Sequence, residues 1–461
     1  MLTARTLPFV LLAPLFALAP PPPGGLVNTD VTFTSDGQSL HGTIISPPGH
    51  PTGRPGVVIV AGAGSTQRDD YRPEAEAYAR AGIVALIYDK RAGYSRATTN
   101  FDDLADDALA GVDVLRSRPE VAPSLVGLWG HSQGGWVVPL AATKSDHVAF
   151  AVTVAAGGLP TARTQLWSNS TYLAHAGVAP ELIGPIGTNL SRILIAANLF
   201  GDTTYDPVAT LAKVKQPLLG IFADNDRSTA PGESLALFKQ ALDRGHNEHY
   251  TLRVIHDASH TLQQSKDGFV VGPDWAPGAF DLMTGWVNRL AASGPPAASA
   301  DQPPAQAAQS EPVAPLSWYE SPGLQVVVVV LLLALFGSYP VGAVVRKLRG
   351  RGNSSGRCNS SGRWPGRLLA AVGPVTVLGT LSYLFYIVQS GSTGVRSSVL
   401  GRPLLWLLLQ IGAVGVVGGL VAAVGLGLGL GRRTFDVRLG AVVVGGVLFL
   451  PWAAYWGLFT V

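Results

Sequence analysis

The stretch Leu125–Val138 reads LVGLWGHSQGGWVV and decides the fold. Residues 125–129 form an apolar run typical of a buried β-strand, and residues 136–142 can form the helix that follows it. Between them lies Gly130–Gly135, GHSQGG, which fits the pattern G-x-S-x-G. This strand–turn–helix context predicts a sharp turn that exposes the hydroxyl group of Ser132, with glycines where larger side chains would clash.

Apolar, β-branched runs alternate with helical stretches on both sides of this turn. Val31–Ile45 alternates around Asp36-Gly37 and predicts a β-hairpin. Near-continuous apolar strands separated by helices indicate an α/β fold with a mostly parallel central sheet, covered on both faces. Further strands are predicted at Gly56–Ala61, Ile83–Tyr88, Ala149–Ala155, Pro217–Ala223 and Tyr250–Ile255, with helices at Pro73–Ala81 and Asp102–Ser117.

Two intervals depart from this alternation. Residues 159–215 are too many for a simple crossover and carry helical patterning, so we expect a helical cap over the carboxyl edge of the sheet. Residues 293–320 are rich in Ala, Pro, Gln and Ser, which predicts a disordered linker. The α/β domain is therefore expected to span residues 26–292.

The remaining chain has the composition of a membrane domain. After Glu320 the one acidic residue is Asp436. Hydrophobic segments long enough to cross a bilayer predict a four-helix, all-α transmembrane domain. They cover residues 324–345, 368–388, 404–430 and 439–461. Intramembrane acids or histidines, which usually mark ion pathways, are missing from them, and Gln410 is the one amide well inside a span. This pattern favours an anchor over a transporter or channel.

Basic residues predict the orientation of these spans. The loop Arg346–Arg367 carries seven basic residues and no acid, and Gly431–Arg438 carries three. The loop between the second and third spans has only Arg396 and Arg402. The positive-inside rule places the first and third loops in the cytoplasm. We therefore expect a multi-pass protein of the cell membrane with its α/β domain on the extracytoplasmic side.

The N-terminus supports export. Residues 1–23 combine Arg5, an apolar run at Leu7–Ala19 and the prolines Pro20–Pro23. This arrangement predicts a signal peptide or, alternatively, an uncleaved N-terminal anchor. The net charge of +3 is small and concentrated near the spans, so no nucleic-acid partner is expected. A single cysteine, Cys358, excludes an intramolecular disulfide.

A serine hydroxyl is a poor nucleophile without a base that takes its proton. For a serine on such a turn the expected chain order is serine, acid, histidine. Asp226 follows the strand at 217–223 and His260 follows the strand at 250–255, so both lie at strand carboxyl ends, where ligands bind in such sheets. We predict His260 as the base and Asp226 as the carboxylate that orients it.

Neighbouring residues offer alternatives. Asp224 is the rival acid, His256 is the rival base, and His131 is expected to serve packing. An oxyanion needs two backbone N–H donors. We assign one to Gln133 and the other to Ala63, with Gly64 as its alternate. The predicted chemistry requires no metal and no cofactor.

Five segments together resemble a known group of proteins. They are VIVAGAGSTQRDD (Val58–Asp70), YDKRAGYS (Tyr88–Ser95), GHSQGG (Gly130–Gly135), FADNDRSTAP (Phe222–Pro231) and DASH (Asp257–His260). The combination is similar to bacterial esterases and serine aminopeptidase-like proteins of the α/β-hydrolase superfamily, related to acylaminoacyl peptidases and dienelactone hydrolases. Ala92 and Tyr94 depart from the usual second motif. The resemblance covers residues 30–292, and its catalytic aspartate matches Asp226.

The resemblance implies acyl-enzyme chemistry on a small ester, thioester or peptide-like substrate, with no cofactor. We therefore expect a membrane-tethered serine hydrolase that cleaves carboxylic esters. The alternatives are a non-catalytic binding or receptor protein that reuses the fold, and a protein whose function lies in the transmembrane bundle. The bilayer is the second expected partner, and the sequence does not indicate an oligomeric state.

Overall fold

The computed structural model describes residues 25–460 except 50–51, 65, 96–98, 200, 204, 349–363, 396 and 430–436. The predicted signal peptide or anchor at residues 1–23 therefore lies outside the described residues, as do Cys358 and most of the predicted basic loop Arg346–Arg367.

One nine-stranded sheet organises the N-terminal two thirds of the chain. Its strand order is β1-β2-β4-β3-β5-β6-β7-β8-β9. The hairpin β1–β2 pairs antiparallel with β4, and all other neighbours are parallel, as predicted. The strands are β1 (Val27–Ser35), β2 (Gln38–Ser46), β3 (Arg54–Val60), β4 (Val84–Tyr88), β5 (Val121–His131), β6 (Ala151–Val154), β7 (Leu218–Ala223), β8 (Tyr250–Ile255) and β9 (Ser299–Ala300).

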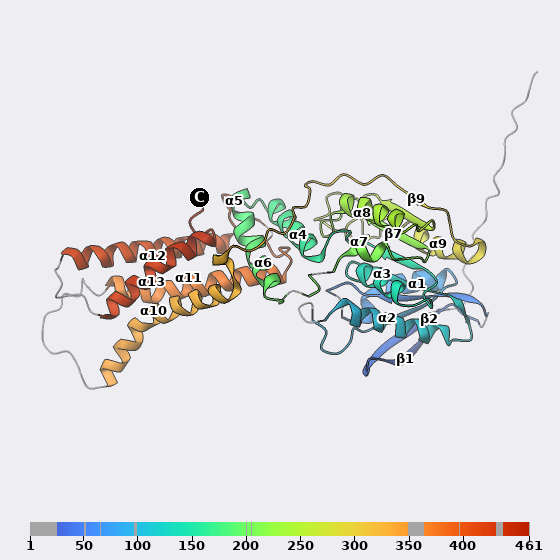
Figure 1. Cartoon of the computed structure of the whole chain (residues 1–461), viewed down its shortest axis with the longest axis horizontal. Helices are drawn as coiled ribbons and strands as arrows, with labels where there is room; N and C mark the ends of the chain where they lie inside the picture. Colours follow the sequence, from blue (N-terminus) through green and yellow to red (C-terminus); the bar gives the residue numbers. More distant parts are fainter. Residues whose placement is uncertain are drawn as a thin grey trace, which may run out of the picture.

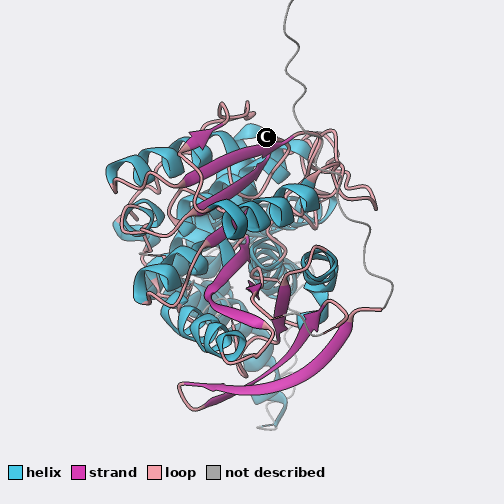
Figure 2. Ribbon diagram, turned by 90° about the vertical axis from the view of Figure 1, so that its right-hand side faces the viewer, coloured by secondary structure: helices cyan, strands magenta, loops and turns pink. Residues whose placement is uncertain are grey.

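Helices cover both faces of this sheet (Figure 2). Alternate side chains of a strand point to opposite faces, so Val58 packs in one core and Ile59 in the other. The first core includes helices α2 (Phe101–Arg116), α3 (Gly134–Lys144) and α8 (Pro231–Arg244), and the second includes α1 (Arg72–Arg80) and α9 (Ala279–Ser293). This is the predicted α/β architecture, and it places the carboxyl ends of β5, β7 and β8 at one edge.

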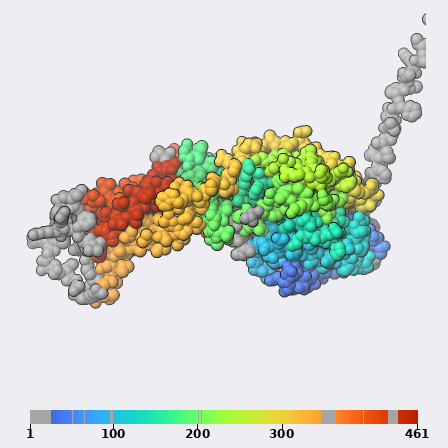
Figure 3. All heavy atoms as spheres, in the orientation of Figure 1, coloured from blue at the N-terminus to red at the C-terminus, as the bar shows by residue number. Residues whose placement is uncertain are grey.

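A group of short helices lies between the sheet and the C-terminal helices (Figure 1). They are α4 (Thr161–His175), α5 (Pro180–Ile183), the π-helical turn η2 (Gly184–Thr188) and α6 (Asn189–Ala196). The last helix of the same segment, α7 (Pro207–Leu211), packs instead beside the sheet, against α3 and α8 (Figure 1). We call residues 159–215 the cap. Leu173 and Ile186 of the cap share one apolar core with Phe336 and Trp406 of the C-terminal helices, so these two parts pack as one body (Figure 3).

Four C-terminal helices are long and apolar enough to cross a membrane. They are α10 (Pro322–Leu348), α11 (Trp364–Gln389), α12 (Leu404–Gly429) and α13 (Val437–Tyr455). Glycines allow them to approach closely. A Cβ atom on Gly373 would lie 2.7 Å from the Phe336 ring, and one on Gly412 would lie 2.5 Å from the Thr376 hydroxyl oxygen.

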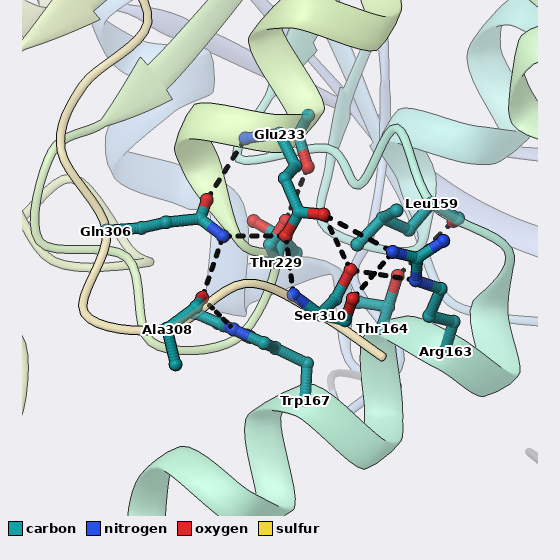
Figure 4. Close-up of polar contacts among 10 residues, drawn as sticks. Leu159, Arg163, Thr164, Trp167, Thr229, Glu233, Gln306, Ala308 and Ser310 are labelled. Atoms are coloured by element: carbon teal, nitrogen blue, oxygen red, sulfur yellow. Dashed lines mark hydrogen bonds and ion pairs between the residues drawn. The ribbon is translucent and has the colours of Figure 1, made fainter. Parts of the chain in front are cut away.

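Residues 293–320 differ from the disordered linker that we expected. Strand β9 pairs with β8, and Gln306, Ala308 and Ser310 are hydrogen-bonded to residues of α4 and α8. Glu233 accepts hydrogen bonds from the Ser310 backbone and from the Gln306 side chain, and the Trp167 indole donates to the carbonyl group of Ala308 (Figure 4). Composition indicates that a segment lacks a core of its own, but it does not reveal polar partners on other elements.

A buried ion pair joins the cap to the end of this segment. The Arg192 guanidinium bonds both carboxylate oxygens of Glu320, at 3.0 and 3.1 Å, and the Tyr455 hydroxyl donates to Glu320 at 3.2 Å. Burial acts to raise the pKa of Glu320, but the Ser317 backbone amide and Arg192 outweigh it and hold that pKa below its usual value. The cap, α10 and α13 are therefore fixed at one point.

The carboxyl group of Glu74 on α1 makes the stability of the protein depend on pH. Burial raises the pKa of Glu74 to about 7, and among the described residues its Oε2 atom has no hydrogen-bond partner. Because the folded protein holds this proton more tightly than the unfolded chain, stability falls as pH rises from about 4.5 to about 7. Glu74→Gln should remove this loss of stability, which reaches about 3 kcal/mol once the pH exceeds the raised pKa.

Melting temperature measured between pH 5 and 8 tests this prediction. Glu76→Gln is the control on the same helix, because the Glu76 carboxylate pairs with Arg80 at 2.6 Å. If both variants retained the wild-type slope of melting temperature against pH, the assignment to Glu74 would be wrong.

Candidate active site

The turn from β5 to α3 holds Ser132 in a strained backbone conformation. Its φ is +54°, in the left-handed region that side chains other than glycine rarely adopt. The glycines beside it are required by close contacts. A Cβ atom on Gly130 would lie 2.2 Å from the Gly134 carbonyl oxygen, and one on Gly134 would lie 2.1 Å from the Val60 carbonyl oxygen. The sharp turn expected from the sequence is therefore present.

Asp226 lies after β7 and is fully buried. Its Oδ1 atom accepts hydrogen bonds from the amides of Ser228 and Thr229, at 2.6 and 3.0 Å. Its Oδ2 atom accepts from the Thr229 hydroxyl at 2.6 Å and faces His260 Nδ1 at 2.8 Å. Burial acts to raise the pKa of Asp226, but His260 and these donors outweigh it and hold that pKa below its ordinary value. The carboxylate is therefore ionised at neutral pH.

Ser132 and His260 line the same cavity, which has a volume of about 380 Å³. Because Nδ1 of His260 faces Asp226, its Nε2 atom remains to exchange a proton with a group in the cavity. The remaining wall includes Ala63, Gly64 and Gln133. The cap contributes Thr161, Thr164, Gln165, Ser168 and Tyr172. The end of α11 and the loop that follows it contribute Gln389, Ser390, Gly391 and Thr393.

The rival residues form a separate pair outside this cavity. Asp224 Oδ2 lies 3.1 Å from His256 Nδ1, and the His256 side chain is 81% exposed. The carboxylate of Asp224 also accepts hydrogen bonds from the amides of Asp257 and Ala258. Asp224 therefore shapes the loop after β8, and neither rival lines the cavity that contains Ser132.

Two side chains connect the segments that carry Ala63 and Gln133. Lys90 Nζ donates to the Gly62 carbonyl oxygen at 2.6 Å and to Gln133 Oε1 at 2.8 Å. The Tyr94 hydroxyl lies 2.9 Å from Gln133 Oε1 and 3.2 Å from the Ala63 carbonyl oxygen. These contacts fix the two backbone segments relative to each other. Tyr94, a departure from the motif of the resemblance, is thus part of the site.

His131 has a hydrogen-bonding role that sequence reasoning missed. Desolvation lowers the pKa of His131 to about 3, and the neighbouring His260 acts in the same direction, so its ring is neutral. The Tyr71 hydroxyl accepts from the Gly62 amide at 2.8 Å and donates to His131 Nδ1 at 2.9 Å. The Nε2–H group of His131 then donates to the His260 carbonyl oxygen at 2.9 Å. This chain joins the Gly62 loop to the His260 loop.

Nothing in the sequence places the loop after α11 at this cavity, because 129 or more positions separate Gln389 from the lining residues that precede it in the chain. The signal available was the adjacency of His131 to Ser132; nothing comparable marks Gln389. Among the residues that the structure describes, no three His, Cys, Asp or Glu side chains group as a metal site requires.

Comparison with known proteins agrees with this architecture. The model of the prolyl oligopeptidase family matches residues 96–271, which is less than half of the chain. Thiohydrolase apmlB from Arthrinium phaeospermum is 28% identical over 132 residues, covering 28% of this chain and 42% of that protein. The chain thus spans less than half the length of this curated relative.

Solved structures match part of this chain at low identity. An acylaminoacyl peptidase from Pyrococcus horikoshii is 18% identical with a TM-score of 0.42, and the match covers 58% of this chain and 42% of that one. A dienelactone hydrolase from Anabaena variabilis is 19% identical with a TM-score of 0.36, and the match covers 56% of this chain and 94% of that one.

The sheet topology shows that the α/β domain has the α/β-hydrolase fold. The match of residues 96–271 to the prolyl oligopeptidase family is consistent with a serine hydrolase. The resemblance predicted from the sequence motifs is confirmed at this level.

Removing the Tyr71 hydroxyl should destabilise the protein. Tyr71→Phe leaves the Gly62 amide and His131 Nδ1 without this partner, and an unsatisfied buried polar group costs about 1–3 kcal/mol. The matched control is Tyr78→Phe, because the buried Tyr78 hydroxyl has no hydrogen-bond partner among the described residues. We expect a lower melting temperature for Tyr71→Phe alone; equal losses in both variants would contradict the role of the network.

Proposed function

We propose that this protein is a membrane-anchored serine hydrolase that cleaves carboxylic esters through an acyl-enzyme on Ser132. The proposal rests on one observation: the Asp226–His260 pair, 2.8 Å apart, faces the cavity into which the strained turn presents Ser132. A nucleophile, a base and a group that orients the base are the parts that acyl transfer needs.

The proposed reaction has two halves. His260 Nε2 takes the proton of the Ser132 hydroxyl group while the Ser132 oxygen attacks the ester carbonyl carbon. The backbone amides of Ala63 and Gln133 stabilise the negative oxygen, with Gly64 as the alternate donor. The ester bond then breaks, and the leaving alcohol takes the proton from His260. A water molecule, deprotonated by His260, then attacks the carbonyl carbon of the acyl-enzyme. The bond between the acyl group and the Ser132 oxygen breaks, His260 returns the proton to that oxygen, and the carboxylic acid leaves.

Charge arrangement supports His260 as the base. The ionised, buried carboxylate of Asp226 fixes the tautomer of His260 and stabilises the imidazolium that forms in each half-reaction. His131, 4.8 Å away between ring centroids, is neutral and therefore does not oppose that positive charge. His131 and Tyr71 are positioning residues, since neither is assigned a proton transfer.

The four apolar helices support membrane anchoring. The distribution of basic residues supports an extracytoplasmic location for the hydrolase domain, with the bilayer as partner and without nucleic acid. Peptide bonds are the second candidate substrate, because the matched family is named for oligopeptidases. Parallel assays with an activated acetyl ester and an aminoacyl anilide distinguish the two substrate classes.

Labelling by a fluorophosphonate, which reacts with activated serines, tests the proposal directly. Full-length protein in membranes should be labelled, whereas Ser132→Ala should be neither labelled nor active toward p-nitrophenyl acetate. Absence of labelling in correctly folded wild-type protein would instead favour a non-catalytic binding protein or a function within the membrane helices.

A pair of substitutions tests which aspartate orients His260. Asp226→Asn should lower kcat by about 10⁴-fold, because the amide no longer holds the required tautomer. Asp224→Asn should retain kcat near the wild-type value, since Asp224 contacts His256 and not His260. Steady-state kinetics with p-nitrophenyl acetate measure both, and a larger loss in Asp224→Asn would reverse the assignment.

A further inference from the structure

The loop that joins α11 to α12, residues 390–403, belongs to the catalytic cavity. The cavity that contains Ser132 and His260 is also lined by Gln389, the last residue of α11, and by Ser390, Gly391 and Thr393 of this loop. Two hydrogen bonds connect the loop to the cap. The Ala179 amide donates to the Gly401 carbonyl oxygen at 2.8 Å, and the Ser398 hydroxyl donates to the Gly177 carbonyl oxygen. The catalytic cavity therefore lies directly at the ends of two apolar helices.

The same loop closes one end of a second cavity, a groove of about 840 Å³ between α11 and α12. Thr393 lines the catalytic cavity, and the next residue, Gly394, lines the groove. Tyr386 packs against this point, since a Cβ atom on Gly394 would lie 2.1 Å from the Tyr386 hydroxyl oxygen. One loop thus forms a wall of both cavities.

The groove has the length and surface of a hydrocarbon site. Along α11 it runs from Ala371 to Tyr386, which is about 22 Å at the rise of an α-helix. This length exceeds the depth of one leaflet, about 15 Å, or half the hydrocarbon thickness of a bilayer. Its rim is aliphatic and open, with Val375 69% exposed and Leu408 55% exposed.

We propose that this groove holds the acyl chain of a long-chain lipid ester embedded in the bilayer, while the ester carbonyl lies at Ser132. The inference rests on the proposed function and names its substrate class. The catalytic cavity of about 380 Å³ accommodates the reacting ester but not a long chain as well. A hydrocarbon chain is the occupant that an apolar groove inside a membrane encounters, and one lipid ester plus water yields one fatty acid and one alcohol.

This assignment gives the four spans a role beyond anchoring. One helix would tether the hydrolase domain but would leave the height and rotation of its cavity free. Here the cap shares its core with the spans, and the ion pair between Arg192 and Glu320 fixes the junction. Ser132 is therefore held close to the membrane surface, where the ester groups of lipids lie.

Filling the groove tests the inference. Full-length protein in phosphatidylcholine vesicles is assayed with p-nitrophenyl palmitate incorporated in the bilayer and with soluble p-nitrophenyl acetate. Val375→Trp should lower the ratio of kcat/KM for palmitate over acetate by about tenfold or more, as expected for loss of over 1.4 kcal/mol of acyl-chain binding. Leu408→Trp, on the opposite wall, should lower the same ratio.

Val414→Trp is the matched control. Val414 is on α12 and 65% exposed, but it does not line the groove, so the ratio should remain that of the wild type. An unchanged ratio in both groove variants, each still labelled by fluorophosphonate, would overturn the inference. A lower melting temperature with an unchanged ratio would identify a structural lipid and would likewise overturn it.

The two proposals fail in different ways. Wild-type protein that hydrolyses the acetate but not the palmitate ester would contradict the acyl-chain groove and leave the serine hydrolase assignment intact. Wild-type protein that cleaves neither ester and is not labelled at Ser132 would contradict the proposed function, and this inference with it.

Discussion

The close approach of α3 to β3 at Gly134 is the constraint on which the site depends. The backbone there lies so near the Val60 carbonyl group that a single added carbon would clash. This contact forces the chain to leave β5 sharply, which places Ser132 at φ +54° above the sheet edge. Because the strands are parallel, the loops after β7 and β8 reach the same edge, where Asp226 pairs with His260 and His260 lines one cavity with Ser132.

Polar networks then remove the remaining freedom of the loops. Lys90 and Tyr94 join the Gly62 segment to Gln133, while Tyr71 and His131 join it to the loop of His260. Each network is partly buried, so its groups are costly to leave unpaired, and this cost favours one arrangement. His131 is neutral, so it does not repel the positive charge of a protonated His260 beside it.

Packing beyond the sheet connects the cavity that contains Ser132 to the apolar C-terminal helices. Apolar residues of the cap belong to the same core as those of α10–α13. The segment before α10 is hydrogen-bonded to Glu233 of α8 and to Trp167 of α4. As a result, the loop after α11 completes the cavity wall. The position of this cavity at the end of the helical bundle is the physical basis for the proposed link between hydrolysis and lipid.

The sequence by itself determined the parts that depend on local periodicity. The apolar runs predicted the parallel sheet and the four C-terminal helices, and the glycine pattern around Ser132 predicted the turn, because these signals act over a few neighbouring residues. Only the tertiary structure decided that His260 pairs with Asp226 and His256 with Asp224, that Gln306 and Ser310 bond to Glu233, and that Gln389 reaches the cavity. Those outcomes depend on contacts between positions far apart in the chain, whose geometry exists only after the sheet, the cap and the helices have packed together.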